Sequence, residues 1–342
     1  MKSRGRITIQ DIVRESGYSK TSVSFAFNSP GRISRKAREK ILSVARDLGY
    51  YPDSLARNFS LQRRNCIGFL LPHGLSVSLK NPYITAVLEG IGSVCQEKEY
   101  TLTMIPPFGE SLSKAVRSAS VDGLITLGME AEMHVAESIR LKHIPYVTID
   151  GNPEGGVPSV NTDDRTAARE IMEHVLNRGH RNIAVISIAG ANEGTAVHSS
   201  VIDRRMEGYR EALADAGLSC PGPTVRVYRS VCSLEGGRTA AQQVLDESWG
   251  CTAAAAMSDI IALGCMQQFR ASGIRIPHDI STAGFDNIPE ASIIAPGLTT
   301  VDQSASVKGR SAARMLFHML ETRSPEPSMV VPHKLVMRES VQ

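Results

Sequence analysis

Lys20, Thr21 and Phe25 are spaced so that one face of a helix would present all three. Thr21 and Phe25 are four residues apart, the spacing of neighbours on a helix surface, and Lys20 flanks them. An ammonium and a hydroxyl can hydrogen-bond the edges of DNA bases, whereas a phenyl ring offers only apolar contact, such as to a thymine methyl. Around them stand polar side chains that could hold phosphate oxygens: Ser19, Ser22, Ser24, Asn28, Arg32 and Ser34. This pattern indicates a surface that contacts double-stranded DNA.

Three helices are expected to position these side chains. Thr8, which we also count among the predicted DNA contacts, can cap the first helix, with Asp11 at the capping-box position and Gly17 ending it. The second helix begins at Ser19 and the third at Ser34. Two helices joined by a short glycine turn, with a third packed against them, form a helix-turn-helix, whose second helix enters the major groove. A plain three-helix bundle is the alternative, but it leaves an exposed Phe beside Lys and Thr unexplained.

Charge is divided unevenly along the chain. Residues 1–64 hold 14 Lys and Arg against 5 Asp and Glu, a net charge of +9, whereas residues 65–342 hold 24 against 30, a net charge of −6. Neutralisation of phosphates with release of counterions supplies most non-specific affinity for nucleic acids, so a small basic head favours a polyanionic partner. A solvated charged face is the alternative that charge alone leaves open.

Residues 50–65 join this head to the rest of the chain. Pro52 can open a helix, and the residues after it can continue the helix for two turns at most. A helix this short is marginal in water and has no core of its own for Phe59.

From residue 66 onward, short apolar runs alternate with helical patterns. This alternation predicts parallel sheets covered by helices on both faces, and nine strands fit two sheets better than one. The expected strands are 66–71, 101–106, 123–128, 145–150, 182–187, 224–228, 253–258, 281–286 and 329–337. The expected helices are 83–98, 132–141, 165–178, 203–216, 235–247, 260–272 and 305–321.

Two segments of the head, ITIQDIVRESGYSKTSVSFAFN and ISRKAREKILSVARDLGYYPDSLAR, resemble the head of the lactose-repressor (LacI/GalR) family of bacterial transcription regulators. The resemblance continues through the body in PYVTIDG, RRMEGYREAL, STAGFDNIPEA and other segments, in the family's order. The family usually has Arg where this chain has Phe25, and Asn where it has Asp53. A Phe cannot make the guanine contact expected of that Arg.

For the linker, the resemblance implies a hinge helix that folds on DNA, in the minor groove. The family's residue at the position of Phe59 is a Leu that wedges between base pairs, and apolar wedges including Phe can kink a duplex in this way. We include Arg57 in the same predicted contact surface. Packing of Phe59 against the body is the alternative.

The fold implied by the resemblance is an all-α helix-turn-helix head followed by an α/β body of two doubly wound parallel-sheet lobes, like a periplasmic sugar-binding protein. Chain crossovers between the lobes are expected near 158–162, 284–288 and 299–329. The expected domains are the head at 1–49, the hinge helix and linker at 50–65, and the effector-binding and dimerisation domain at 66–342. The expected lobes are about 66–158 with 287–300 and 330–342, and about 162–284 with 303–327.

Small ligands in such folds bind outside the carboxyl ends of the strands, in the cleft between the lobes. Carried over residue by residue, the family's cleft residues correspond to Arg205, the strand-end carboxylates Asp150 and Asp286, and Gln303 on the last crossover. Such groups suit a hydroxyl-rich ligand, because each makes charge-assisted hydrogen bonds to OH groups. For the two Asp residues, capping a helix is the alternative.

Other cleft positions differ from the family's pattern. Ser258 stands where the family usually has Asn, and the position that often stacks an aromatic ring on the ligand falls on Val231 or Cys232. Residues 73–80 lengthen the first loop, which reshapes the mouth of the cleft. Tyr83 could add a ring or a hydroxyl, with packing as its alternative role.

An enzyme is the first rival interpretation. The sequence has no phosphate-binding glycine loop, no His-Glu-x-x-His and no Gly-x-Ser-x-Gly motif, so we expect no catalytic residue, cofactor or metal. The six cysteines are widely spaced, which favours reduced core residues.

A secreted solute-binding protein is the second rival. The basic head argues against it, as does the start of the chain, MKSRGRITIQ, which has no apolar segment after its charges. No apolar run approaches the roughly 20 residues that span a bilayer, so no membrane partner is expected.

The sequence therefore predicts a DNA-binding transcription regulator, a repressor controlled by a small molecule, in the cytoplasm of a bacterium. Two copies would bind a pseudo-palindromic operator as a homodimer, and the effector is expected to be a carbohydrate. The chain has no C-terminal leucine heptad, which favours a dimer over a tetramer.

Overall fold

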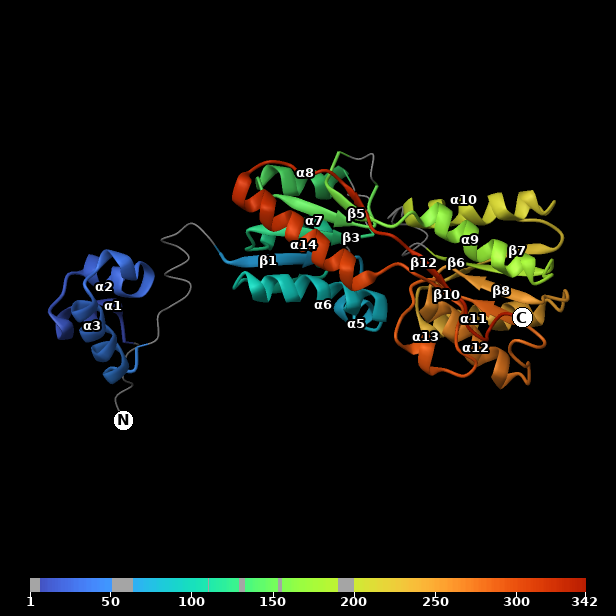
Figure 1. Ribbon diagram of the computed structural model, residues 1–342, viewed down its shortest axis with the longest axis horizontal. Coiled ribbons are helices and arrows are strands. Elements are labelled where there is room, and N and C mark those ends of the chain that lie inside the picture. Colours follow the sequence, from blue (N-terminus) through green and yellow to red (C-terminus); the bar gives the residue numbers. More distant parts are fainter. Residues whose placement is uncertain (1–6, 51–63, 110, 129–132, 153–155, 190–199) are drawn as a thin grey trace. The chain divides into compact units, whose positions relative to one another are not determined.

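The computed structural model describes residues 7–50, 64–109, 111–128, 133–152, 156–189 and 200–342 (Figure 1). The chain divides into two compact units, Met1–Asn65 and Cys66–Gln342, which we call the head and the body. Their boundary coincides with the expected end of the linker. Most of the expected hinge helix, residues 51–63, lies outside the described residues.

The described part of the head contains three α-helices, and each begins and ends within about two residues of its expected bounds. They are α1 (Ile9–Ser16), α2 (Lys20–Asn28) and α3 (Arg35–Asp47), with a 3-10 turn, η1 (Pro30–Arg32), between the last two. Gly17 ends α1 in the left-handed conformation, with φ at 74°, so that α2 can begin after only a short turn. The inward faces of the helices meet in a small core of Ile12, Val23, Ala26, Ile41 and Ala45.

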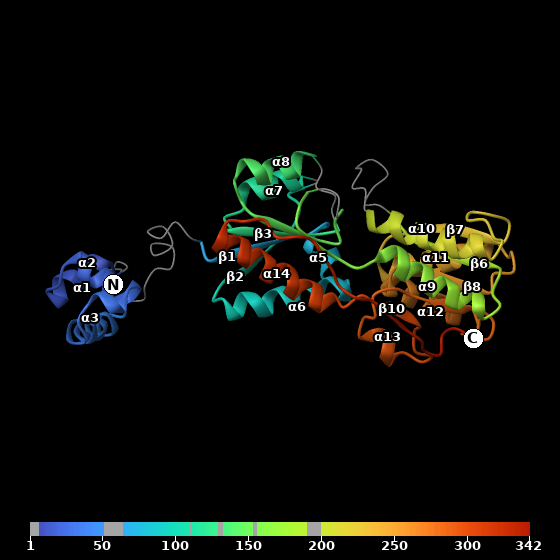
Figure 2. The same ribbon diagram turned by 45° about the horizontal axis from the view of Figure 1, so that its top comes forward.

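The first lobe of the body contains a six-stranded parallel sheet in the order β11-β5-β4-β3-β1-β2. Its strands are β1 (Cys66–Leu70), β2 (Thr101–Ile105), β3 (Gly123–Leu127), β4 (Tyr146–Ile149), β5 (Ser159–Asn161) and β11 (Met329–Val330). Helices α7 (Leu112–Ser118) and α8 (Met133–Leu141) cover one face, and α6 (Pro82–Glu97) and α14 (Ala305–Thr322) cover the other (Figure 2). A single helical turn, α5 (Leu75–Ser78), lies in the loop after β1.

The second lobe contains a four-stranded parallel sheet in the order β7-β6-β8-β9. Its strands are β6 (Ile183–Ile188), β7 (Val225–Ser230), β8 (Ala253–Ala256) and β9 (Ser281–Ala283). Helices α9 (Asp164–Asn177) and α10 (Ser200–Asp215) cover one face, and α11 (Leu234–Asp246) and α12 (Asp259–Ala271) cover the other (Figure 1). Alternate residues of β6 pack on opposite faces: Ile183 and Val185 against α9 and α10, Ala184 and Ile186 against α11 and α12. Both lobes are therefore doubly wound, as the sequence predicts.

Three of the four helix layers of the body, all but that of α7 and α8, contain a glycine at the point where two helices cross. A Cβ added to Gly90 of α6 would lie 2.1 Å from the carbonyl oxygen of Ser306 in α14, and one added to Gly208 of α10 would lie 2.1 Å from that of Arg165 in α9. Gly264 of α12 approaches the backbone of α11 equally closely, at 2.1 Å. No side chain fits at these crossings, so the paired helices meet backbone to backbone.

Some short elements of the body were not expected from the sequence. Strands β5 and β10 (Thr300–Asp302) have three residues each, and the helices α5, α7 and α13 (Glu290–Ile293) have four to seven. The expected strand at 329–337 is two strands, β11 and β12 (Lys334–Val336), interrupted at Pro332, which cannot donate a ladder hydrogen bond. β12 pairs with β10 in an antiparallel ribbon.

The expected assignment of late segments to lobes is wrong. Helix α14, expected within the second lobe at 303–327, packs against α6, β3 and β4 of the first. Segment 287–300 and the end of segment 330–342, expected in the first lobe, lie with the second. The backbone N–H of Thr299 donates to Ser340 Oγ at 2.8 Å, and the N–H of Thr282 in β9 donates to the Ser340 carbonyl at 2.8 Å.

The chain therefore crosses between lobes after β5, between β10 and α14, and between β11 and β12. The expected crossover at 284–288 is wrong, because that stretch stays beside β9, where Gly284 N–H donates to the Thr299 carbonyl at 2.9 Å. Alternating strands and helices show the order of the elements along the chain, but not which sheet each element joins.

Candidate functional site

In the head, three hydroxyl residues stand at the helix N-termini. The backbone N–H of Thr8 donates to Asp11 Oδ2 at 2.9 Å, which completes the expected capping box. Ser19 Oγ accepts from the Ser22 N–H at 3.1 Å, and Ser34 Oγ accepts an N–H at 3.3 Å at the start of α3. Thr8, Ser19 and Ser34 are exposed. A helix N-terminus with an exposed cap is suited to bind a phosphate, because its N–H groups and dipole favour an anion.

The face of α2 that carries the predicted base contacts lies opposite the core. Lys20 and Thr21 are exposed in its first turn, while Val23 and Ala26 are buried against the other helices. Phe25, expected to be exposed, is half-buried. The guanidinium carbon of Arg32 lies 5.8 Å from the centroid of the Phe25 ring, a distance typical of a cation–π contact.

Of the remaining predicted DNA contacts, four lie in the described part of the head and two do not. Ser22 and Ser24 are half-buried on α2 and Arg32 is exposed in η1, whereas Asn28 is the last residue of α2. Arg57 and Phe59 lie outside the described residues.

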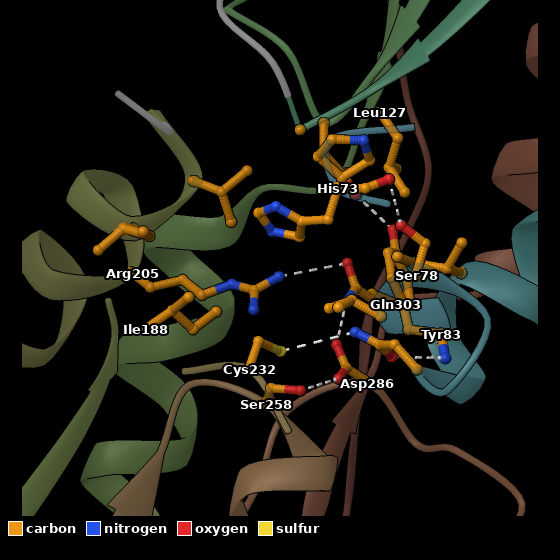
Figure 3. Close-up of a pocket in the computed structure, with 18 of the residues that line it drawn as sticks. His73, Ser78, Tyr83, Leu127, Ile188, Arg205, Cys232, Ser258, Asp286 and Gln303 are labelled. Carbon is orange, nitrogen blue, oxygen red and sulfur yellow. Dashed lines mark hydrogen bonds between the residues drawn. The ribbon is translucent and has the colours of Figure 1, made fainter. Parts of the chain in front are cut away.

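In the body, a cavity of about 170 Å³ lies between the two lobes, at the carboxyl ends of both sheets (Figure 3). The six predicted effector-binding residues all line it: Tyr83, Asp150, Arg205, Ser258, Asp286 and Gln303. They come from α6, the end of β4, α10, the end of β8, the loop after β9, and the segment between β10 and α14. The carboxyl ends of parallel strands meet at one edge of each sheet, which is why residues so far apart in sequence converge here.

Arg205 is buried on the second-lobe side of the cavity, with 4% of its surface exposed. Its Nε donates to Asp164 Oδ1 at 2.9 Å, and its guanidinium carbon lies 3.7 Å from the centroid of the Phe285 ring. Burial opposes the charge of the guanidinium, but the carboxylates around it, Asp164 foremost, outweigh burial and raise the pKa of Arg205. Arg205 is therefore a fixed cation at the edge of the cavity.

Asp286 is the carboxyl that faces this cation. It accepts hydrogen bonds from Ser258 Oγ at 2.7 Å, from Gln303 Nε2 at 2.5 Å and from the Asp259 N–H at 3.3 Å. Burial raises the pKa of Asp286, and the positive charge of Arg205 opposes that rise. Burial and the charge of Asp286 likewise raise the pKa of Asp259 behind it.

Behind three of the lining residues lies a buried lysine that sequence reasoning missed. Lys308 of α14 is fully buried, and its Nζ donates to Asp150 Oδ1 at 2.6 Å, to Gln303 Oε1 at 2.6 Å and to Tyr83 Oη at 3.3 Å. The Tyr83 hydroxyl donates to the other oxygen of Asp150. Asp150 is thus a buried, ion-paired carboxylate rather than a helix cap, and both of its oxygens already accept hydrogen bonds from the protein.

Gln303 joins the two halves of this network. Its Oε1 accepts from Lys308 and, at 3.4 Å, from Nη2 of Arg205, while its Nε2 donates to Asp286. The network therefore runs from the first lobe, through a residue on a connecting segment, to the second lobe.

The mouth of the cavity also holds residues that were not predicted. The α5 turn brings His73 and Ser78 to the cavity, and the imidazole of His73 points into it (Figure 3). Burial lowers the pKa of His73, which keeps the ring neutral near pH 7. Of the two candidates for the aromatic position, Cys232 lines the cavity and Val231 is exposed. Burial raises the pKa of Cys232 to about 11, so it is a thiol that accepts from Asn81 Nδ2 at 3.5 Å.

Within the described ranges, no cluster of three His, Cys, Asp or Glu side chains could hold a metal ion. No helix in that part of the chain is long and apolar enough to cross a membrane. All six cysteines are free.

Two family models match the chain. Residues 8–53 match the model described as bacterial regulatory proteins, lacI family, and residues 172–341 match a periplasmic binding protein-like domain. The HTH-type transcriptional regulator DegA of Bacillus subtilis is 30% identical over 345 residues, which cover 98% of this chain and 98% of that protein.

Solved structures are similar over the same length. A complex of the transcriptional regulator CelR with cellobiose has a TM-score of 0.70 and 25% identity, covering 98% of this chain and 100% of that one. The lac repressor dimer bound to operator and the anti-inducer ONPF has a TM-score of 0.83 and 23% identity, covering 98% of this chain and 99% of that one, a likeness of fold.

Proposed function

This chain belongs to the lacI family of bacterial regulatory proteins, and from that membership we propose that it represses transcription in response to a small molecule bound between the lobes of its body. Members of the family are transcription regulators rather than enzymes. The observation that carries the proposal is the convergence of Arg205, Ser258 and Asp286 on one cavity at the strand ends, in a chain that also has a helix-turn-helix head.

The head is proposed to bind the operator through α2. Lys20 and Thr21 would contact base edges in the major groove, and the capped N-termini at Thr8, Ser19 and Ser34 would hold phosphates, with Ser22, Ser24, Asn28 and Arg32 as further backbone contacts. From the resemblance alone we propose Arg57 and Phe59 as minor-groove contacts, with Phe59 as the wedge that kinks the duplex. A regulator of this kind would act in the bacterial cytoplasm, where its operator lies.

Two chains are proposed to bind one pseudo-palindromic operator. An apolar groove formed by α11, α12 and α13 supports a second copy as its occupant, since Leu234, Leu263 and Ile294 line it and Ile293 is 81% exposed beside them. A two-fold interface is self-complementary, and it would present two heads to the two halves of a palindrome.

The ligand is proposed to be a carbohydrate of one ring or a related polyol. A cavity of about 150 Å³ holds a benzene molecule, so the cavity here, at about 170 Å³, fits a single ring. Arg205, Asp286 and Ser258 would bind its hydroxyl groups, while Ile188 and Val201 would pack on its apolar face. The complex of CelR with cellobiose supports a sugar as the ligand class. Tyr83, Asp150 and Gln303 are proposed as the floor beneath the ligand, because the buried Lys308 donates a hydrogen bond to each of them.

Selection from a random duplex library tests the DNA-binding part of this proposal. The full chain should enrich a two-fold symmetric site with half-sites one helical turn or a multiple of it apart, and should bind it with two chains per duplex.

Titration calorimetry against a panel of monosaccharides, disaccharides and nucleosides tests the ligand part. One member should release heat and change the affinity for the selected site. If no panel member did either, the sugar proposal would be wrong while the DNA proposal stood.

The pH dependence of ligand affinity should follow the charge of Asp286. Burial raises the pKa of this carboxyl, so at acidic pH a large fraction of it carries a proton and accepts fewer hydroxyl hydrogen bonds. Affinity for the active panel member should therefore rise between about pH 5 and about pH 8. Asp286→Asn should bind more weakly, with a flatter profile, whereas Asp246→Asn, which changes an exposed carboxyl on α11, should keep the parent profile. Calorimetric Kd values at four or five pH values would decide, and an equally steep profile in Asp286→Asn would contradict the assignment.

A further inference from the structure

Phe25 occupies a position from which a side chain of α2 can reach base edges, yet its ring has no hydrogen-bond donor or acceptor. We propose that Phe25 makes an apolar contact with the C5-methyl group of a thymine in the major groove of each operator half-site, and so recognises that pyrimidine. This inference rests on the proposed function and specifies what the head recognises.

The placement of the ring follows from the geometry of α2. Ser19 caps the helix, Thr21 is exposed in its first turn, and Phe25 follows Thr21 by four residues, so the two are neighbours on one helix face. Val23 and Ala26 fix the orientation of the helix, because they are buried in the core of the head at 0% and 1% exposure. The accessible part of Phe25 therefore lies on the face that carries Thr21 and not on the face that packs.

Arg32 holds the ring in position. Its guanidinium carbon lies 5.8 Å from the ring centroid. α2 ends at this point, where the Ser29 N–H donates to the Phe25 carbonyl at 2.9 Å, and η1, which carries Arg32, follows directly. Arg32 is itself exposed, so it can contact a phosphate while its guanidinium remains beside the ring. A ring fixed in this way loses little conformational freedom when it binds, and the adjacent charge brings it close to the DNA backbone.

The chemistry of the major groove then determines what the ring can discriminate. All four bases present polar atoms there, and covering such an atom with a phenyl ring removes its water without replacing the hydrogen bond. Of the four, thymine alone also presents a methyl group, at C5, which loses no hydrogen bond when an apolar ring covers it. 5-Methylcytosine presents the same methyl group, so it shares the chemistry that the ring recognises.

The experiment uses the full chain and its selected operator, and the decisive measurement requires no variant. Each thymine in a half-site is replaced in turn by deoxyuridine, which removes only the C5-methyl, and Kd is measured by fluorescence anisotropy at fixed salt. At one position per half-site the replacement should weaken binding about fourfold, and about fifteenfold when made in both half-sites, as expected for one buried methyl in each. Replacing that T·A pair by C·G should weaken binding further, and methylating the cytosine at C5 should recover about fourfold per half-site.

A variant then assigns the effect to its side chain. In Phe25→Ala the ratio of Kd values between the deoxyuridine and thymine operators should fall to about one. In Glu15→Ala, which changes an exposed residue of α1 outside the predicted DNA contacts, the ratio should stay as in the parent chain. Uniform tolerance of deoxyuridine at all thymines would overturn the inference, as would a ratio unchanged in Phe25→Ala or the absence of any gain from 5-methylcytosine. Failure to select any operator would instead contradict the proposed function, so the two failures are distinguishable.

Discussion

The Lys308→Met variant should unfold with a free energy about 3–5 kcal/mol lower than that of the parent chain. Lys308 is 0% exposed, and its ammonium lies 2.6 Å from a carboxylate oxygen of Asp150, which is itself buried. Met has a similar length and no charge, so the change fills the space. Among the described residues it leaves the buried Asp150 carboxylate with the Tyr83 hydroxyl as its side-chain partner. An uncompensated buried charge is costly because the interior cannot solvate it.

Urea denaturation followed by far-UV circular dichroism would measure this change. Lys98→Met is the matched control, since Lys98 also pairs with a carboxylate, Glu321, at 2.9 Å, but both side chains are largely exposed and the pair should be worth less than about 1 kcal/mol. The double variant Lys308→Met with Asp150→Asn should regain part of the lost stability, because it removes both charges. A loss below about 1 kcal/mol in Lys308→Met would contradict the assigned role of this lysine in the ion pair.

The Lys20→Ala variant should lose base discrimination at one position of each operator half-site. Lys20 is exposed in the first turn of α2, where an ammonium can donate to O6 and N7 of guanine, and a specific contact of this kind is worth about 1–3 kcal/mol. With two heads on one operator, the loss in affinity for the selected site should be about 2–6 kcal/mol, while affinity for random duplex DNA should change little.

Repeating the library selection with the variant measures the loss of discrimination directly. Lys36→Ala, which removes an exposed lysine of α3 from the same head, serves as control and should weaken binding to all sequences alike. If Lys20→Ala selected the same base pair at every position with the same preference, α2 would not be the reading helix.

Local structure in the head was predictable because its signals are short-range. The capping residues Thr8, Ser19 and Ser34 and the left-handed Gly17 act within one turn of the chain, so their positions in sequence define the helix ends directly. The half-burial of Phe25 was not predictable, since it depends on where the chain goes after α2.

Lys308 could have been found from its spacing, although it was missed. Residues 308, 312 and 316 repeat every four positions along α14, and Ala312 and Leu316 are buried, so the lysine occupies a position in an apolar stripe. A lysine on the inward face of a helix indicates a buried partner. That partner is Asp150, which lies 158 residues away in the sequence. Helix periodicity could not identify it.

The convergence of the six cleft residues could be foreseen from the rule that strand ends meet at one edge of a sheet, applied through the family resemblance. What their polar atoms do in the absence of a ligand could not be foreseen. Asp150 was expected as a ligand contact or a cap, but both of its oxygens are taken by Lys308 and Tyr83, because α14 lies against the first lobe and not the second as expected.

The glycine crossings in the helix layers bear on the stiffness of the body. Where Gly90, Gly208 and Gly264 bring two backbones into contact, no flexible side chain separates the helices and could absorb strain by changing rotamer. Each lobe should therefore resist elastic deformation and move as one piece. When a ligand in the cavity displaces one lobe relative to the other, the chain would then bend only at the three short connections between the lobes. Little of the movement would be lost within the sheets before it reaches β1, the strand that follows the linker.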